Sequence, residues 1–279
     1  MDDPATQNSQ ARRIAIALVV VLLLAGGAWW YWHQPATAEN VAVTPPAQVA
    51  GAAANAPVTE AIRHPLQPTT GVGDAAAPVV PVDPEAALQA GLTTLIGEPA
   101  LAQWFIPEQL LRRLVATTDN LARNARIEPL RPLRAPTTPF AVQREVLDAT
   151  TGTERITLGA PNFSRYDAVV ALLAKTDMPA AAQLYRQLYP ALQKSYEDLG
   201  FPDRYFNDRV VEVIDHLLAT PEPNVPLLLE QPKVLYRYAD AELESRTAGQ
   251  KLLLRMGVNH TRTIKQKLRE FRAQIAIKE

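Results

Sequence analysis

The sequence predicts a mainly α domain of the α+β class, preceded by an N-terminal transmembrane helix and a disordered Pro- and Ala-rich linker. Three observations support this prediction. A run of apolar residues lies near the N-terminus, prolines are frequent directly after it, and apolar residues recur at helical spacing beyond residue 84. Because a stretch of strand composition interrupts the helices, we also expect a small β-hairpin or a three-stranded antiparallel sheet.

The composition excludes several classes of protein. The 279 residues include 28 basic and 29 acidic side chains, which argues against a surface that is positively charged throughout. The absence of cysteine excludes disulfides, thiolate zinc sites, iron–sulfur clusters and thiol nucleophiles. We expect no cofactor and no metal site.

Residues 14–32 (IAIALVVVLLLAGGAWWYW) carry no charge, and a helix of this length spans about 28 Å, close to the hydrocarbon thickness of a bilayer. The run ends in Trp29, Trp30, Tyr31 and Trp32, residue types that are enriched at the membrane interface. We therefore predict a single membrane span, with the lipid bilayer as a partner of the chain.

The flanking charges predict the orientation of this span. Arg12 and Arg13 directly precede it, whereas the next basic residue, Arg63, lies about thirty positions beyond it. Residues 1–13 should then be a cytoplasmic leader at a bacterial inner membrane, with the C-terminal domain in the periplasm. A cleaved signal peptide is the alternative, because residues 36–38 (ATA) resemble a cleavage site, although the apolar run exceeds the usual ~7–15 residues.

Residues 33–84 have the composition of a disordered linker. Their nine prolines remove backbone donors and favour extended conformations, so that both helices and sheets are disfavoured. We expect His33 and His64 to lie in this unfolded segment, and residues 85–279 to form one folded domain.

Apolar periodicity bounded by Pro or Gly predicts the helices of this domain. The predicted helices are 85–97, a short helix with Trp104 and Phe105, a longer helix that begins at Pro107, a helix that begins at Ser164, 177–199 with Pro190 inside it, 207–219, a helix that ends at Gly257, and 259–275. Asp83, Ser164 and Asn259 are the predicted N-caps.

Strands are predicted between the helices. Prolines at 129, 132, 136 and 139 exclude a helix there, and the runs 140–147 and 155–158 flank turn residues, which indicates a β-hairpin. Residues 233–238 are the candidate third strand.

Several strings resemble those of the domain of unknown function 3014 family, uncharacterised proteobacterial proteins with one N-terminal membrane span. These strings are RLVATTDNLA at 113–122, RYD at 165–167, YEDLGFP at 196–202, YRYAD at 236–240, and residues 250–257 followed by Asn259 and KLR at 267–269. They occur in order across 85–279. The resemblance implies no activity, ligand or catalytic residue.

Reactive groups are sparse in the domain. His216 should face water beside Glu212, and His260 should lie in the first turn of a helix, so neither is expected to be catalytic. No serine lies in a G-x-S-x-G turn and no glycine-rich phosphate loop is present. Glu197, Asp198 and Asp203 could form a carboxylate pair, although a charged helix end is the simpler interpretation.

The last helix combines an apolar seam with a basic face. The basic residues are Arg262, Lys265, Lys267, Arg269 and Arg272. This face has three interpretations: a solvated face, a patch for an anionic envelope protein, lipid or cell-wall polymer, and DNA binding, against which export across the membrane argues.

These observations favour a membrane-anchored periplasmic binding or scaffold module of the bacterial envelope, without catalytic residues. The alternative is an envelope hydrolase that uses a carboxylate pair. A remote alternative is nucleic-acid binding through the C-terminal basic helix.

Overall fold

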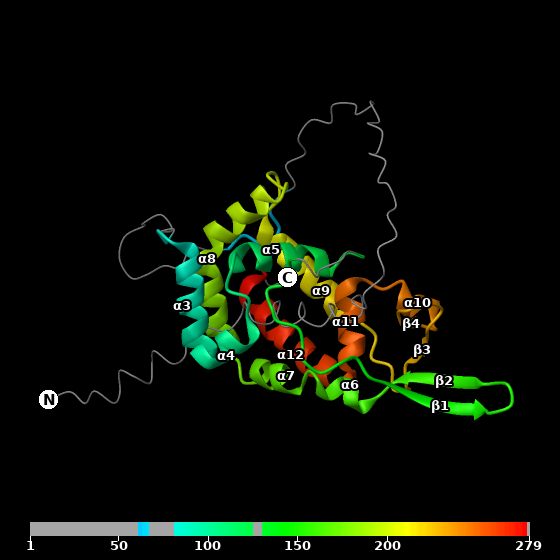
Figure 1. Ribbon diagram of the computed structural model, residues 1–279. Helices are drawn as coiled ribbons and strands as arrows, with labels where there is room; N and C mark the ends of the chain where they lie inside the picture. The colour runs from blue at the N-terminus through cyan, green and yellow to red at the C-terminus, as the bar shows by residue number, and fades with distance from the viewer. Residues whose placement is uncertain (1–60, 67–80, 125–129, 278–279) are drawn as a thin grey trace, which may run out of the picture.

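The computed structural model describes residues 61–66, 81–124 and 130–277. Its helices form one body, from which a β-hairpin extends (Figure 1). The elements are α3 (Pro84–Ile96), α4 (Glu98–Trp104), α5 (Leu110–Leu121), β1 (Val142–Asp148), β2 (Thr153–Leu158), α6 (Ala160–Ser164), α7 (Asp167–Ala174), α8 (Met178–Asp198), α9 (Phe206–Leu218), β3 (Leu228–Glu230), β4 (Arg237–Tyr238), α10 (Ala241–Glu244), α11 (Ala248–Met256) and α12 (Val258–Ile275). The mainly helical class with a small antiparallel sheet is confirmed.

The predicted membrane span, residues 14–32, lies outside the described residues. Within the described ranges, no helix combines the length and the apolar character needed to cross a bilayer.

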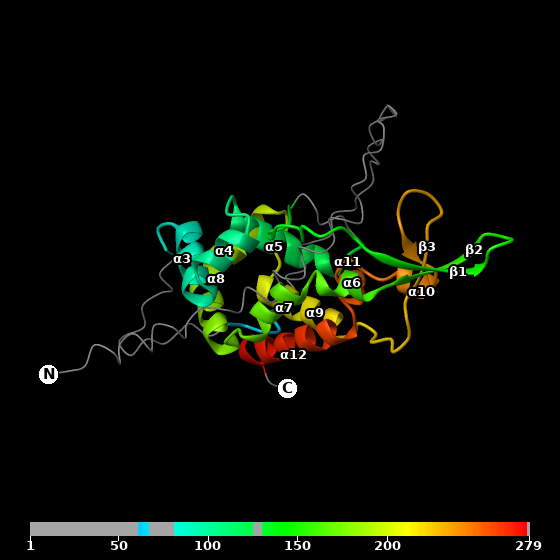
Figure 2. The same cartoon turned by 60° about the horizontal axis from the view of Figure 1, so that its bottom comes forward.

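The core of the body lies where α12 packs against α7, α8 and α9; Figure 2 shows α12 running alongside α7 and α9. The predicted apolar seam of α12 is confirmed, since Ile264, Leu268, Phe271 and Ile275 are all at most 3% exposed. Phe271 meets the Tyr185 ring edge to face, with ring centroids 5.7 Å apart. This edge-to-face geometry is one that aromatic pairs prefer.

Helix ends confirm some of the predicted caps and correct others. The Asp83 carboxylate accepts a hydrogen bond from the Ala86 amide at 2.9 Å, as an N-cap does. Gly257 ends α11 with a φ of +85°, and it also directly precedes α12. The predicted N-cap Asn259 is therefore wrong, because α12 has already begun at Val258. Ser164 is also no N-cap: it is the last residue of α6, and its hydroxyl donates to the Pro161 carbonyl.

The sheet is antiparallel in the order β1-β2-β3-β4. The predicted hairpin is confirmed, but a three-stranded sheet is wrong, because four strands are present in the described part of the chain. The missed strand, β3, pairs Leu229 with Ile156 and follows directly on a proline-rich loop. Of the predicted strand 233–238 only Arg237–Tyr238 pairs, since the Gln231 side chain closes a turn onto the Val234 carbonyl.

Residues 61–66 form a short segment, the clip, that contacts the start of α9. The Asp208 carboxylate accepts from the Arg63 amide at 2.8 Å and from the His64 amide at 2.7 Å. The Asn207 side-chain amide donates to the His64 carbonyl at 2.7 Å. The prediction of disorder throughout 33–84 is therefore wrong for the clip, because three of its backbone groups bind side chains of α9.

Candidate functional site

The hairpin of β1 and β2 projects from the body with most of its residues exposed (Figure 1). Two cross-strand ion pairs stabilise it: Arg144 contacts Glu154 at 2.7 Å, and Arg155 contacts Glu145 at 3.1 Å. β1 is an outer strand of the sheet, so one edge of its backbone has no neighbouring strand among the described residues. Such an edge can pair with an extended segment of another chain.

Exposed apolar side chains gather at the sheet. Of the eight large hydrophobic residues exposed in the described part of the chain, five lie on its strands or on the loops beside them. These sheet-end residues are Val146, Leu147, Val225, Leu228 and Val234, which are 49–69% exposed. Large apolar side chains left in water at one end of a molecule can mark an interaction site.

A cleft of about 420 Å³ lies at the base of the hairpin. Its apolar lining includes Leu158, Phe163, Leu254 and Val258, together with the proline-rich segment 221–226. This hairpin-base cleft also includes Gln143 of β1 and the sheet-end residue Val225, so the cleft adjoins the outer strand and one of the exposed apolar side chains.

Two glycines keep the backbone close to the side chains that line this cleft. A Cβ atom at Gly257 would lie 2.9 Å from the Phe163 ring, and Gly257 also has the positive φ that disfavours other residues. A Cβ atom at Gly159 would lie 2.5 Å from the Gln143 side chain. A larger residue at either position would therefore shift a side chain of the lining.

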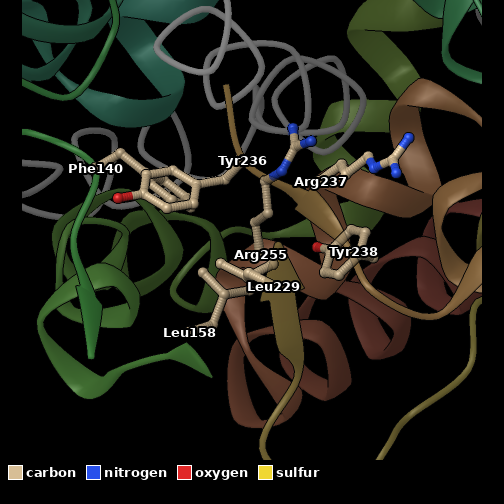
Figure 3. Close-up of a pocket in the computed structure, with 7 residues that line it drawn as sticks. All are labelled: Phe140, Leu158, Leu229, Tyr236, Arg237, Tyr238 and Arg255. Atoms are coloured by element: carbon tan, nitrogen blue, oxygen red, sulfur yellow. The ribbon is translucent and has the colours of Figure 1, made fainter. Parts of the chain in front are cut away.

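A second pocket, between the sheet and α11, is part of the packing. Figure 3 shows the side chains that line it, with Phe140 beside Tyr236 and with Leu158 and Leu229 below them. The rings of Phe140 and Tyr236 have centroids 5.7 Å apart, and the space has no room for water. We therefore assign this pocket to the small apolar core that attaches the sheet to α11.

The basic residues of α12 do not form one free surface. Lys265 is only 5% exposed and donates to the Thr220 carbonyl and, at 2.7 Å, to Glu222. Its predicted place in an exposed patch is therefore wrong, because its ammonium group is a partner of the 219–227 loop. Among the other basic residues, Arg262 pairs with Glu222, Lys267 pairs with Glu270, and Arg272 pairs with Asp215. Arg269 is exposed and forms no ion pair with a described residue.

The carboxylate of Glu222 is shared by two basic residues of α12, Arg262 and Lys265. Hydrogen bonds from Lys265 and then from Arg262 hold the pKa of its carboxyl below the usual value. Because Glu222 also lines the hairpin-base cleft, the same ion pairs fix one wall of the cleft against α12.

The candidate carboxylate pair is not brought together by a narrow cleft. Glu197 accepts from Gln193, and Asp198 pairs with Lys194 at 2.6 Å while remaining 62% exposed. A broader hollow of about 750 Å³ beside Asp198 also contains Asp83 and Glu85. Asp83 caps α3, and Glu85 accepts from the Leu110 and Leu111 amides at the start of α5, so both carboxylates contribute to helix ends.

The two histidines of the domain have structural partners. His216 is half-buried, and its Nε2 lies 2.8 Å from the Thr247 hydroxyl, so the prediction that it faces water beside Glu212 is wrong. Burial lowers the pKa of His216, with the nearby Arg209 charge acting in the same direction. His260 contacts Asp167 at 2.9 Å. The described residues contain no group of three or more His, Asp or Glu side chains placed to bind a metal.

The exposure of the sheet-end residues could not be predicted from the sequence pattern. Val146 and Leu147 are consecutive in a strand, which directs one side chain to each face, and a pattern of this kind is typical of a strand that is covered on both faces. Their exposure therefore shows that neither face of the hairpin is covered at this point. No comparable signal marks Val225 or Val234, because loop residues carry no periodicity.

Comparison with known proteins identifies a family but no function. No curated protein and no solved structure matches the chain. The family described as "Protein of unknown function (DUF3014)" matches residues 110–272, which include α5 to α11 and most of α12, together with the hairpin and its cleft. That match covers more than half of the chain. The chain therefore belongs to the DUF3014 family.

Proposed function

We propose that this protein is a membrane-anchored periplasmic module that binds another envelope protein at its hairpin end. The observation that carries the proposal is the position of the sheet-end residues, five exposed hydrophobic side chains around one small sheet. In a folded domain with a well-filled core, exposed apolar groups of this size favour a surface that a partner covers.

The free edge of β1 and the hairpin-base cleft favour an extended polypeptide as the bound segment. An added strand gains backbone hydrogen bonds along β1, and its alternate side chains need an apolar recess. Gln143 lies both on β1 and in the cleft lining, so a strand paired with β1 reaches the cleft at this residue.

The anchor and the linker support the envelope location. The apolar run 14–32 and the basic residues before it favour a span with the domain outside the cytoplasm. A tether of this kind suits a module that meets partners near the membrane.

Site-specific photo-crosslinking of the full-length chain in intact cells tests the proposal. A crosslinkable residue replaces Val146 or Val225 at the hairpin end, and Val82, a fully exposed valine beside α3, is the control. We expect one envelope protein to crosslink from both 146 and 225 and not from 82. Adding Val146→Asp should remove the crosslink formed from position 225, because the charge opposes burial of the strand.

Other outcomes contradict the proposal. Equal crosslinking from position 82 would show a non-specific surface, and crosslinks to lipid alone would make the hairpin a membrane contact. A crosslink from position 225 that still forms in the Val146→Asp variant would show that the cleft binds its partner independently of the hairpin. The single binding surface proposed above would then be wrong.

A further inference from the structure

The clip lies on the start of α9 in the way that a bound peptide does. The Leu66 amide donates to the Tyr205 hydroxyl at 3.1 Å, beside the two amides that donate to Asp208. The residues joined by these bonds are 139 to 145 positions apart in the sequence. The contacts are therefore tertiary, and a segment of a separate chain could form the same bonds.

Asp208 is the main acceptor of this site. Each of its two carboxylate oxygens accepts one backbone amide of the clip, and the carboxylate accepts no other hydrogen bond from a described residue. Hydrogen bonds to a charged acceptor are stronger than those between neutral groups. Both oxygens of Asp208 are thus used for an extended backbone and not for the packing of the body.

Asn207 is a donor that the body holds in place. Its backbone amide donates to the Tyr189 hydroxyl at 3.1 Å, and its side-chain oxygen accepts from the Tyr185 hydroxyl at 3.1 Å. The fully buried side-chain amide donates to the Ile275 carbonyl at 3.0 Å as well as to the His64 carbonyl at 2.7 Å. Because three of these contacts do not involve the clip, the group that binds the His64 carbonyl is preorganised.

Two side chains of the clip add specificity to the backbone contacts. Leu66 packs against the hydrophobic core of the body, and Nδ1 of His64 accepts from the Ile277 amide at 3.3 Å. Ile62, Arg63 and Pro65 are exposed. An extended segment with a histidine and, two positions later, an aliphatic residue can therefore make the same contacts.

We propose that the start of α9 is a peptide-binding site, that the clip is its intramolecular ligand, and that an extended segment of another polypeptide with this histidine–aliphatic pattern can replace it. Such a segment displaces the clip, because both use the same donors and acceptors. The site is separate from the hairpin-base cleft, whose lining includes none of Tyr205, Asn207 and Asp208.

A synthetic peptide of residues 59–69 (TEAIRHPLQPT) tests the proposal. It is titrated into the purified full-length chain that carries His64→Pro and Leu66→Asp, the clip variant. Proline removes the His64 amide donor, and aspartate opposes burial against the core. By fluorescence anisotropy we expect saturable binding of one peptide per clip variant. Binding to the unaltered chain should be at least about tenfold weaker, because the linked clip competes at a high effective concentration.

Matched substitutions locate the binding site. Asp208→Asn, added to the clip variant, should weaken peptide binding by about fivefold to tenfold, because it removes one of the two acceptors. Asp215→Asn makes the same exchange at an acid further along α9 that pairs with Arg272, and it should leave peptide binding unchanged. A peptide with His64→Ala and Leu66→Ala should not bind.

Four results would overturn the proposal. One is the absence of saturable peptide binding to the clip variant. Another is loss of cooperative thermal unfolding in that variant, because the clip would then be part of the folded domain and not a ligand. Equal effects of Asp208→Asn and Asp215→Asn would place the peptide elsewhere, and equal binding of the alanine peptide would show that the contact is non-specific.

Discussion

The helical body and the sheet end use their apolar residues differently. In α12 the four seam residues are almost completely buried, whereas Val146 and Val225 are 60% and 69% exposed. Burial of a large apolar side chain contributes roughly 1.5–3 kcal/mol to folding, and an exposed one contributes little. Stability should therefore depend on the body and partner binding on the sheet end, so that substitutions can separate the two.

The largest expected effect is a cavity in the body. Leu268 is 0% exposed, and Leu268→Ala should reduce the free energy of unfolding by about 2–5 kcal/mol. Val146→Ala on the hairpin should change it by less than about 0.5 kcal/mol. Chemical denaturation of the full-length chain measures both. Equal losses in the two variants would show that the hairpin is part of the stabilising core.

An intermediate effect is expected where the body meets the cleft. Glu222→Gln leaves the buried Lys265 ammonium without its carboxylate and should cost about 1–3 kcal/mol at neutral pH. Glu145→Gln removes an exposed ion pair from the hairpin and should cost no more than ~1 kcal/mol.

The pH dependence of the Glu222 effect follows from its lowered pKa. A carboxyl whose pKa is lower in the folded than in the unfolded state stabilises the fold at pH values above its unfolded-state pKa, which is about 4.3. This contribution is lost as the pH falls through the folded-state pKa. The difference in unfolding free energy between the unaltered chain and Glu222→Gln should thus be constant near pH 7 and shrink below about pH 4. A difference that grows on acidification would contradict the assigned role of Glu222.

The smallest expected effect concerns the clip. Asp208→Asn removes one of two acceptors for the Arg63 and His64 amides, at a cost of about 1 kcal/mol. Hydrogen exchange at these two amides should accelerate by about fivefold to tenfold, with little change in global stability. Asp215→Asn on the same helix breaks a pair with Arg272 and should leave their exchange unaltered.

Much of the helical body could be predicted because its helices are long, periodic and bounded by Pro and Gly. The strand β3 could not be predicted, because a strand of only three residues that follows a proline-rich loop shows no periodicity. The position of Lys265 was also beyond a sequence argument, since its partners Thr220 and Glu222 lie more than forty residues away on another loop. The sheet-end residues and the cleft depend on which segments remain uncovered, and helical spacing does not determine that.

The clip sets a limit on how far the domain can move from its proposed anchor. Between the predicted span and the clip lie residues 33–60, which covalent geometry allows to extend about 100 Å at most, whereas a chain free up to residue 83 could extend about 180 Å. Because effective concentration falls roughly as the −3/2 power of tether length, the clip raises the local concentration of the domain at a membrane-bound partner about two- to threefold. With the proposed anchor in place, the four hydrogen bonds to the start of α9 would shorten the distance over which the hairpin can reach a partner.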